Sequence, residues 1–392
     1  MARLFDFQAN PRAARIQLAL LAVVLIVFPF VAAPFGNSWV RIMDFALLYI
    51  MLALGLNIVV GLAGLLDLGY IAFYALGAYM TGLLASPQFA VVLESFVNQY
   101  PAIGNALVAF FGPEIAKNGI HLSVWMIVPL GAALAALFGI LLGAPTLKLR
   151  GDYLAIVTLG FGEIIRIFMN NLSGPVNITN GPQGINLIDP IRIFGVSLAG
   201  EPGSQSTVFI GGFSMPSVTA YYFLFLLLCI ATVFISMRLQ HSRLGRAWVA
   251  IREDEIAAKA MGINTRNMKL LAFGMGATFG GVSGVMFAAF QGFVSPESFS
   301  LMESVMIVAM VVLGGIGHLP GVILGAVLLS ALPEVLRWVS GVLDLQSITG
   351  GRLDPAILRQ LLIALAMIIV MLLRPRGLWP TPEHGKSLQT RA

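Results

Sequence analysis

The sequence predicts an all-α protein, a polytopic membrane bundle of about ten transmembrane helices. Three observations favour this class. Of the 392 residues, 58% are hydrophobic and only 10% are charged, whereas a soluble domain carries about 25% charged residues. The mean hydropathy is +0.91. The apolar residues form long continuous runs, whereas a closed membrane barrel would alternate polar and apolar residues. A soluble globular protein and a barrel are both excluded.

Apolar runs long enough to cross a bilayer follow one another along the chain, because a core about 30 Å thick takes about 20 apolar residues per helix. They occupy residues 16–34, 43–61, 65–85, 122–143, 153–170, 219–237, 270–290, 303–316, 321–337 and 357–373. The first run follows Arg3, Arg12 and Arg15 and is too long for the core of a signal peptide, so we expect a retained first helix. The third, the eighth and the ninth runs are candidates for re-entrant or broken helices.

The distribution of Lys and Arg predicts the orientation of these spans. With the N-terminus in the cytoplasm, 16 of the 23 basic residues fall in cytoplasmic segments. An even number of spans also places the C-terminus there. We therefore expect one transmembrane domain over residues 1–392, with periplasmic loops at 86–121 and 171–218. The first half of five spans then starts on the cytoplasmic side and the second half on the periplasmic side, an opposite orientation that fits an inverted repeat. The net charge of +5 follows from this orientation and does not indicate nucleic acid binding.

Two stripes of small residues predict close helix packing, because helices associate in lipid where small side chains let backbones approach. They are Gly131, Ala135, Gly139 and Gly143 in the fourth span and Ala272, Gly276, Gly280, Gly284 and Ala288 in the seventh. Each set repeats every four residues and so forms one helix face. We expect packing within the bundle, while a face beside a moving pathway or a subunit contact stays an alternative.

A few polar and charged side chains fall at membrane depth. A charge there costs about 2.5 to 3.5 kcal/mol on insertion scales, so it needs a partner or a wet cavity. Glu163 and Arg166 are three residues apart on the fifth span, and this spacing predicts an ion pair. Each has an alternative to a transport role. Glu163 and Arg166 could form a purely structural ion pair, and Asp67 could cap a helix. Asn57 and Thr158 could bond to neighbouring backbone. The possible residues of a translocation path are Asn57, Asp67, Tyr70, Thr158, Glu163 and Arg166.

No catalytic or metal site is evident in the sequence. Cys229 is the single cysteine, which excludes an intrachain disulfide and a multi-cysteine metal site. The four histidines fall in four different loops, so no pair of nucleophile and base is visible. An enzyme is disfavoured.

The segment 238–270 is the least membrane-like part of the chain. It holds seven of the 23 basic residues and an acidic cluster at 253–255. Residues 252–262 have acids first, good helix formers next and Gly262 last, which predicts a short helix that ends at the glycine. We expect this helix to lie along the cytoplasmic face of the membrane.

This segment resembles the cytoplasmic coupling loop of ABC importer permeases, whose motif is Glu-Ala-Ala, three residues, then Gly. Ala257, Ala258 and Gly262 fit the spacing, whereas the acid is displaced to Glu255 and Ile256 takes its place. The departure is found in the LivM-type permeases of high-affinity branched-chain amino acid importers. Further blocks that resemble this family are 69–79, 150–163, 179–185, 245–257, 291–299 and 311–317. Together the matches extend over most of residues 45–375.

The resemblance implies the permease subunit of a bacterial inner-membrane ABC importer. Its partners would be a homologous second permease, two cytoplasmic ATPase subunits and a periplasmic substrate-binding protein. The ATPase-coupling residues would be Arg252, Glu253, Asp254, Glu255, Ala257, Ala258 and Gly262.

The chain has no Walker A motif to bind ATP itself. Its only Gly-Lys-Ser, at 385–387, has Pro380 where that motif needs glycine. We therefore expect no cofactor in this chain, and expect ATP and Mg²⁺ to be bound by the partner ATPase subunits.

The implied substrates are leucine, isoleucine and valine, with phenylalanine as a further candidate. Related permeases serve urea, amides or other amino acids, and this alternative stays open. A different class would be an ion-coupled secondary carrier with Asp67 or Glu163 as its proton site, or a passive channel. Neither explains the coupling-like segment.

Overall fold

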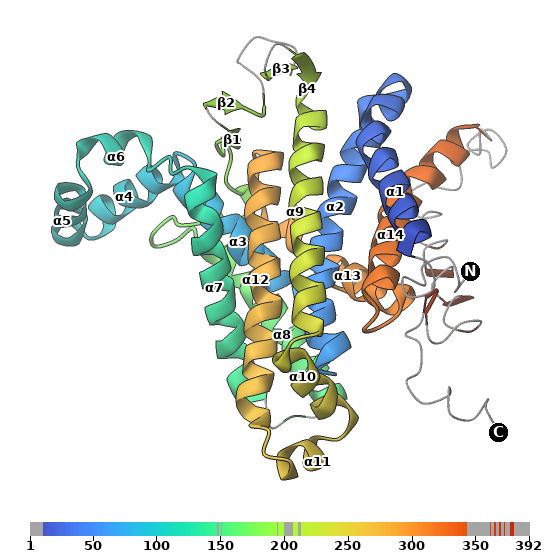
Figure 1. Ribbon diagram of the computed structural model, residues 1–392. Helices are drawn as coiled ribbons and strands as arrows, with labels where there is room; N and C mark the ends of the chain where they lie inside the picture. The colour runs from blue at the N-terminus through green and yellow to red at the C-terminus, as the bar shows by residue number, and fades with distance from the viewer. Residues whose placement is uncertain are drawn as a thin grey trace, which may run out of the picture.

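The computed structural model describes residues 11–342, except 147–148, 150, 194, 200–206 and 211–212, together with 377–379 and a few positions between 361 and 372. Long helices lie side by side and make up most of the structure (Figure 1). The predicted helical membrane bundle is confirmed, with two small hairpins that the all-α prediction did not include. The tenth predicted span lies largely outside the described residues.

The first half of the chain contains a broken helix, α2, and three short helices between α3 and α7. Its helices are α1 (Pro11–Ala32), α2 (Asn37–Asn57), α3 (Ile71–Leu84), α4 (Gln88–Gln99), α5 (Pro101–Phe111), α6 (Pro113–Asn118), α7 (Val124–Thr146) and α8 (Asp152–Asn171), with the short turn η1 (Ala33–Phe35) before α2. A π-helical turn, η2 (Ile58–Leu62), extends α2, and the chain is then non-helical up to Tyr70. The third apolar run is therefore helical only from Ile71. The expected loop 86–121 folds largely into α4, α5 and α6.

The second half begins with the hairpins and ends with two helices joined by a short loop. In order, its elements are η3 (Gly181–Gln183), β1 (Arg192–Ile193), β2 (Val196–Ser197), β3 (Thr207–Ile210), β4 (Phe213–Pro216), α9 (Ser217–Gln240), α10 (Arg243–Glu253), α11 (Glu255–Ala260), α12 (Thr265–Gln291), η4 (Pro296–Phe299), α13 (Leu301–Gly314) and α14 (Leu319–Val342). β1 pairs with β2 and β3 with β4, both antiparallel. The hairpins lie at one end of the bundle, and α10 and α11 lie at the other (Figure 1).

Five helical segments are long and apolar enough to cross a membrane within the described part of the chain. They are Asn37–Leu62, Val124–Thr146, Ser217–Gln240, Thr265–Gln291 and Pro296–Gly314. The pair α3 and α4, bent by 77° at its break, would be a sixth. The chain is thus a multi-pass membrane protein, whereas ten spans and the orientation stay predictions.

Helix α12 lies between α7 and α3, and glycines bring the three backbones together. A Cβ added to Gly281 of α12 would lie 2.6 Å from the carbonyl oxygen of Gly131 on α7. A Cβ added to Gly77 of α3 would lie 2.8 Å from the carbonyl carbon of Gly281. Real Cβ atoms do not approach this closely, so only glycine fits. The predicted stripes do pack within the bundle: Gly131 and Gly139 of α7 face α12, whereas Gly276, Gly280 and Gly284 of α12 face α2 and α3. The α12 glycine that meets Gly131, Gly281, lies outside the predicted stripe.

Candidate functional site

The candidate site includes α10, a helix that begins after the polar cap residue Ser242 and ends at Glu253, next to Asp254. The Ser242 side chain accepts a hydrogen bond from Gly245 N at 3.2 Å, which satisfies a free donor of the first turn. Trp248 is fully buried, and its indole nitrogen donates to the carbonyl of Met268 on α12 at 2.7 Å. α10 is therefore fixed to α12 through one large side chain.

A sharp break at Asp254 separates α10 from α11. The Asp254 carboxylate accepts hydrogen bonds from the backbone of Ile256 at 2.8 Å and of Ala257 at 3.0 Å, so it caps α11. The predicted single helix over 252–262 is therefore wrong: a capping aspartate with extended backbone divides it. The predicted end at the glycine is confirmed, because α11 stops at Ala260 and Gly262 follows with a positive φ of 85°.

The predicted coupling residues point in different directions. Glu255 forms an ion pair of 2.8 Å with Lys269 of α12, whose side chain is only 8% exposed. Ala258 is buried, whereas Ala257 and Glu253 are exposed. The acid of the motif thus neutralises a buried lysine.

The apolar surface at the tip of α11 was not among the predicted coupling residues. Ile256 is 73% exposed and Met261 is 83% exposed, next to charged side chains. Large apolar side chains exposed outside a membrane can mark an interaction surface, and these two lie at the two ends of α11. The displacement of Ile256 into the acidic position of the motif was the sequence signal for this surface. We call Ile256 and Met261 the tip residues.

Arg252 turns inward from the end of α10. Its Nη1 donates to the carbonyl oxygen of Gly61 at 2.5 Å, and its Nη2 lies 3.1 Å from Glu253 Oε1. Gly61 belongs to the π turn η2 that ends helix α2. Arg252 therefore connects α10 to the place where α2 is broken.

Four of the predicted path residues lie around this break of α2. Asn57 is buried, and its Oδ1 accepts a hydrogen bond of 2.9 Å from Gly317 N in the loop between α13 and α14. Asp67 Oδ1 accepts from Gly69 N at 2.9 Å, while its Oδ2 has no hydrogen-bond partner among the described residues. Tyr70 donates to the carbonyl of Gly276 at 2.8 Å.

The fourth of these residues, Thr158 of α8, accepts a hydrogen bond of 3.0 Å from Leu68 N. The carbonyl of Leu68 in turn accepts from Ser304 Oγ of α13 at 2.5 Å. The non-helical segment 63–70 is therefore held by α8 and α13 together. Ser304 was not predicted, since a lone serine in an apolar helix gives no pattern.

Glu163 and Arg166 lie together on α8, apart from the other four. Arg166 Nη2 lies 2.9 Å from Glu163 Oε2, as the spacing predicts, and Arg166 Nη1 lies 3.9 Å from Glu297 Oε1 of η4. Both side chains of the pair are 28% exposed. This is a partly exposed charge cluster on α8, a helix that the sequence predicts as the fifth span and that is not among the five segments given above.

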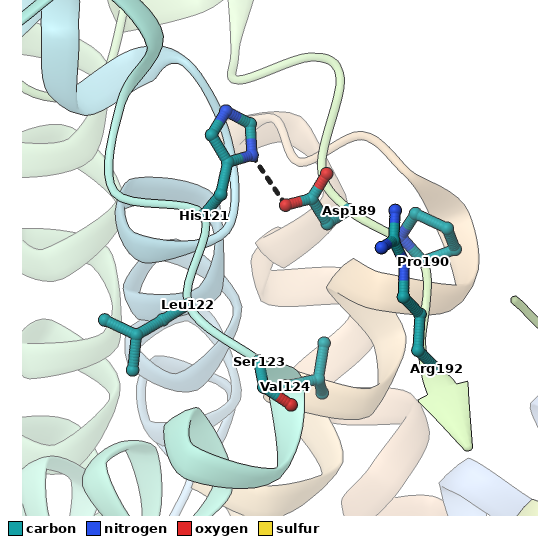
Figure 2. Close-up of a pocket in the computed structure, with 7 residues that line it drawn as sticks. All are labelled: His121, Leu122, Ser123, Val124, Asp189, Pro190 and Arg192. Atoms are coloured by element: carbon teal, nitrogen blue, oxygen red, sulfur yellow. Dashed lines mark hydrogen bonds and ion pairs between the residues drawn. The ribbon is translucent and has the colours of Figure 1, made fainter. Parts of the chain in front are cut away.

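A small pocket is lined by residues at and before the start of α7 and at and before β1. Figure 1 shows β1 and the start of α7 well away from α10 and α11. The pocket volume is about 280 Å³, and its lining comprises His121, Leu122, Ser123, Val124, Asp189, Pro190 and Arg192. Figure 2 shows His121 and Asp189 pointing toward each other, with Nδ1 and Oδ2 2.6 Å apart. His121 Nε2 lies 2.7 Å from the carbonyl oxygen of Asn118. Both nitrogens thus face acceptors, which only the protonated imidazolium satisfies.

The His121 pair predicts a pH dependence. The hydrogen bond to Asp189, with a smaller contribution from the Asn118 carbonyl, raises the pKa of His121 above its ordinary value of 6.5. The stabilisation by this pair is therefore fully present below about pH 6.5 and is lost as pH rises through the raised pKa. Because both side chains are about a third exposed, we expect it to contribute at most about 1 kcal/mol.

Titration of ¹³C-labelled histidines by NMR measures this pKa directly. Asp189→Asn is expected to lower the pKa of His121 by removing the hydrogen bond that raises it, and His121→Gln identifies its resonance. A pKa of His121 that does not change in the Asp189→Asn variant would contradict the prediction.

No group of three or more His, Cys, Asp or Glu side chains that could hold a metal ion occurs among the described residues.

Comparison with known proteins gives a match over most of the chain. The family model described as branched-chain amino acid transport system, permease component, matches residues 38–371. The high-affinity branched-chain amino acid transport system permease protein LivM of Escherichia coli is 40% identical over 381 residues, which cover 96% of this chain and 77% of that protein. No solved structure gives a significant match.

More distant relatives match over a similar extent. The probable branched-chain amino acid transport permease protein LivM of Methanocaldococcus jannaschii is 25% identical over 86% of this chain and 96% of its own length. The permease protein LivH of the same Escherichia coli transport system is 24% identical over 86% of this chain and 93% of its own length.

Proposed function

The chain belongs to the family of branched-chain amino acid transport permeases, and from this membership we propose that it is the permease subunit of an ABC importer for leucine, isoleucine and valine. Phenylalanine is a further expected substrate. The observation that carries the proposal is the 40% identity to Escherichia coli LivM along 96% of the chain. Transport is driven by ATP hydrolysis in partner subunits, and this chain is not itself an enzyme and holds no cofactor.

The proposed location is the bacterial inner membrane, with about ten spans and both termini in the cytoplasm. Seven of the 23 basic residues lie in the segment 238–270, which contains α10 and α11. Because Lys and Arg are retained on the cytoplasmic side, this end of the bundle faces the cytoplasm. The hairpins and the His121 pocket then face the periplasm. Residues 1–392 form one permease domain.

The proposed partners are a homologous second permease, two ATPase subunits and a periplasmic binding protein. Similarity to both LivM and LivH of one transport system supports a pair of homologous permeases. The ATPase subunit docks on α10 and α11, where the tip residues Ile256 and Met261 offer apolar surface beside the exposed Glu253. The binding protein, which binds at the periplasmic end, provides most of the substrate selectivity.

Glu163 and Arg166 are the residues that we place beside the translocation path. Both are 28% exposed on α8, the predicted fifth span, and charged groups at membrane depth face water or protein rather than lipid. Asn57, Tyr70 and Thr158 are buried and bonded to backbone, and so support the path wall from behind. Asp67 is buried with one oxygen unpartnered among the described residues, which leaves it a candidate path residue.

The experiment that tests the function is purification followed by uptake. The tagged chain is expected to copurify with a second permease and two ATPase subunits. Proteoliposomes of this complex, with ATP inside and binding protein outside, should accumulate labelled leucine. Excess valine or isoleucine should compete, whereas urea and acetamide should not.

The outcomes of this experiment separate the alternatives. Uptake of urea in place of leucine would assign a different substrate class. Leucine uptake that follows a proton gradient without ATP would indicate a secondary carrier. The variant Arg166→Gln tests the proposed path, because uptake should fall while the ATPase subunits still copurify.

A further inference from the structure

The end of helix α2 leaves backbone carbonyls without helical partners. The π turn η2 is closed by Ala63 N, which donates to the carbonyl of Ile58 at 3.2 Å, and Leu65 N donates to the carbonyl of Val59 at 3.0 Å. The chain is non-helical after this point, so the carbonyls of the last turn need other donors. For the buried carbonyl of Gly61 the donor is the guanidinium of Arg252, which comes from α10, 191 residues later.

Glycines make room for the Arg252 side chain at this place. A Cβ on Gly64 would lie 2.5 Å from Cγ of Arg252, and Gly64 also has a positive φ of 69°. A Cβ on Gly317 would lie 3.2 Å from Arg252 Nη1 and equally far from the Gly61 carbonyl oxygen. The aliphatic part of Arg252 thus packs on Gly64 in the segment 63–70, while its guanidinium lies next to Gly317 in the loop between α13 and α14. The planar guanidinium presents its donors in a fixed fork, so Arg252 can donate to Gly61 and Glu253 at the same time, which suits a lysine ammonium less well.

The segments that Arg252 contacts are tied to the rest of the membrane domain. Gly317 N donates to Asn57 of α2, which joins the loop between α13 and α14 to the broken helix. The segment 63–70 that follows Gly61 is held by Thr158 of α8 and Ser304 of α13 through Leu68. A displacement of Arg252 would therefore be transmitted through these hydrogen bonds to α2, α8 and α13 and to the loop before α14.

We propose that Arg252 is a positioning residue that transmits movement of α10 and α11 to the non-helical segment 63–70, and is not a docking residue for the ATPase subunit. The inference rests on the proposed function, since it needs a motor that moves α10 and α11. The Glu253 side chain is 71% exposed and can face the partner, whereas the Arg252 side chain is 36% exposed, with Nη1 bound to the Gly61 carbonyl and Nη2 to Glu253.

The test compares ATP hydrolysis with transport in the purified complex. In Arg252→Gln, the ATPase subunits should copurify at the wild-type level and ATP hydrolysis should change less than about twofold, while leucine uptake falls about tenfold, within the range for a residue that couples two sites. The number of ATP molecules hydrolysed per leucine then rises about tenfold. Arg252→Lys should restore part of the uptake, because a lysine can still donate to one carbonyl.

The matched control is Arg246→Gln on the same helix. Arg246 Nη1 also donates to a backbone carbonyl, that of His241 at 2.9 Å, but this acceptor lies at the start of the same segment. The ratio of ATP hydrolysed to leucine transported should stay at the wild-type value. A ratio that rises equally in both variants would show a general charge effect and overturn the proposal.

A labelling measurement reports the movement itself. Leu66→Cys, in a Cys229→Ala background, places one thiol in the segment 63–70. Its rate of reaction with a maleimide should change when ATP and vanadate trap the ATPase subunits, and Arg252→Gln should abolish this change without altering the starting rate.

Each remaining outcome has a distinct meaning. If the wild-type chain neither copurifies with ATPase subunits nor transports leucine, the proposed function fails. If the wild type is active and Arg252→Gln keeps the wild-type ratio and labelling change, only the role of Arg252 fails. Loss of ATPase subunits from both Arg252→Gln and Arg252→Lys would make Arg252 a docking residue and also overturn the inference.

Discussion

Replacing both tip residues by aspartate, Ile256→Asp with Met261→Asp, is expected to detach the ATPase subunit and abolish leucine uptake. The two side chains are 73% and 83% exposed in the isolated chain, and docking would bury them. A buried charge without a partner is costly, and the few hot-spot residues of an interface each contribute about 2 kcal/mol or more. We expect the affinity for the ATPase subunit to fall by about 30-fold or more, at about 1.4 kcal/mol per factor of ten.

The measurement is the amount of ATPase subunit retained on the tagged permease, together with uptake in proteoliposomes. Ile256→Val with Met261→Leu is the control, because it keeps the apolar surface and should retain both. Neither tip residue contacts the core, so the aspartate variant should reach the membrane at the wild-type level. Full retention of the ATPase subunit by the aspartate variant would place the docking surface elsewhere.

Gly281→Val is expected to destabilise the packing of the membrane bundle strongly. Gly281 contacts two other helices: its own Cβ would be 2.6 Å from the carbonyl oxygen of Gly131 on α7, and a Cβ on Gly77 of α3 would be 2.8 Å from the Gly281 carbonyl carbon. Backbone atoms cannot turn aside as a side chain can, so the three helices must separate. Overpacking of this kind costs about 1 to 3 kcal/mol and sometimes more, a large part of a stability of about 5 to 15 kcal/mol.

Thermal denaturation of the purified permease in detergent measures this loss. The control is Gly160→Val on α8, which makes the same change in a helix at a glycine whose Cβ would meet nothing within 4 Å. Gly160→Val should melt close to the wild type, whereas Gly281→Val should melt much lower or fail to be recovered. Equal melting temperatures for the two variants would show that the close contact of α3, α7 and α12 does not limit stability.

The parts of the fold that local sequence patterns determine were predicted. The spacing of Glu163 and Arg166 gives the ion pair, and the four-residue repeat of small side chains gives the packing face of α7 and the face of α12 toward α2 and α3. Gly262 marks the end of α11 because it is the residue that accepts a positive φ. Each of these features depends on residues within a few turns of one another.

The features that the sequence did not predict depend on distant partners or on two local rules in conflict. An aspartate is favourable both in the first turn of one longer helix and as the N-cap of a new helix. Its hydrogen bonds to Ile256 N and Ala257 N make Asp254 the N-cap of α11. The late start of α3 at Ile71 depends on Thr158 and Ser304, which hold the preceding segment from other helices. The contact of Arg252 with Gly61 spans 191 residues and leaves no local pattern.

The contact of three backbones at Gly281 also determines how the molecule can move. Helices that touch through their backbones have no intervening side chains whose rotamers could change, so they resist sliding past one another. We expect α3, α7 and α12 to travel as one stiff block, with the non-helical residues 63–70 and the break at Asp254 as its joints. A transport cycle in this chain is then a rocking of that block between two orientations, in which the joints bend and the block keeps its shape.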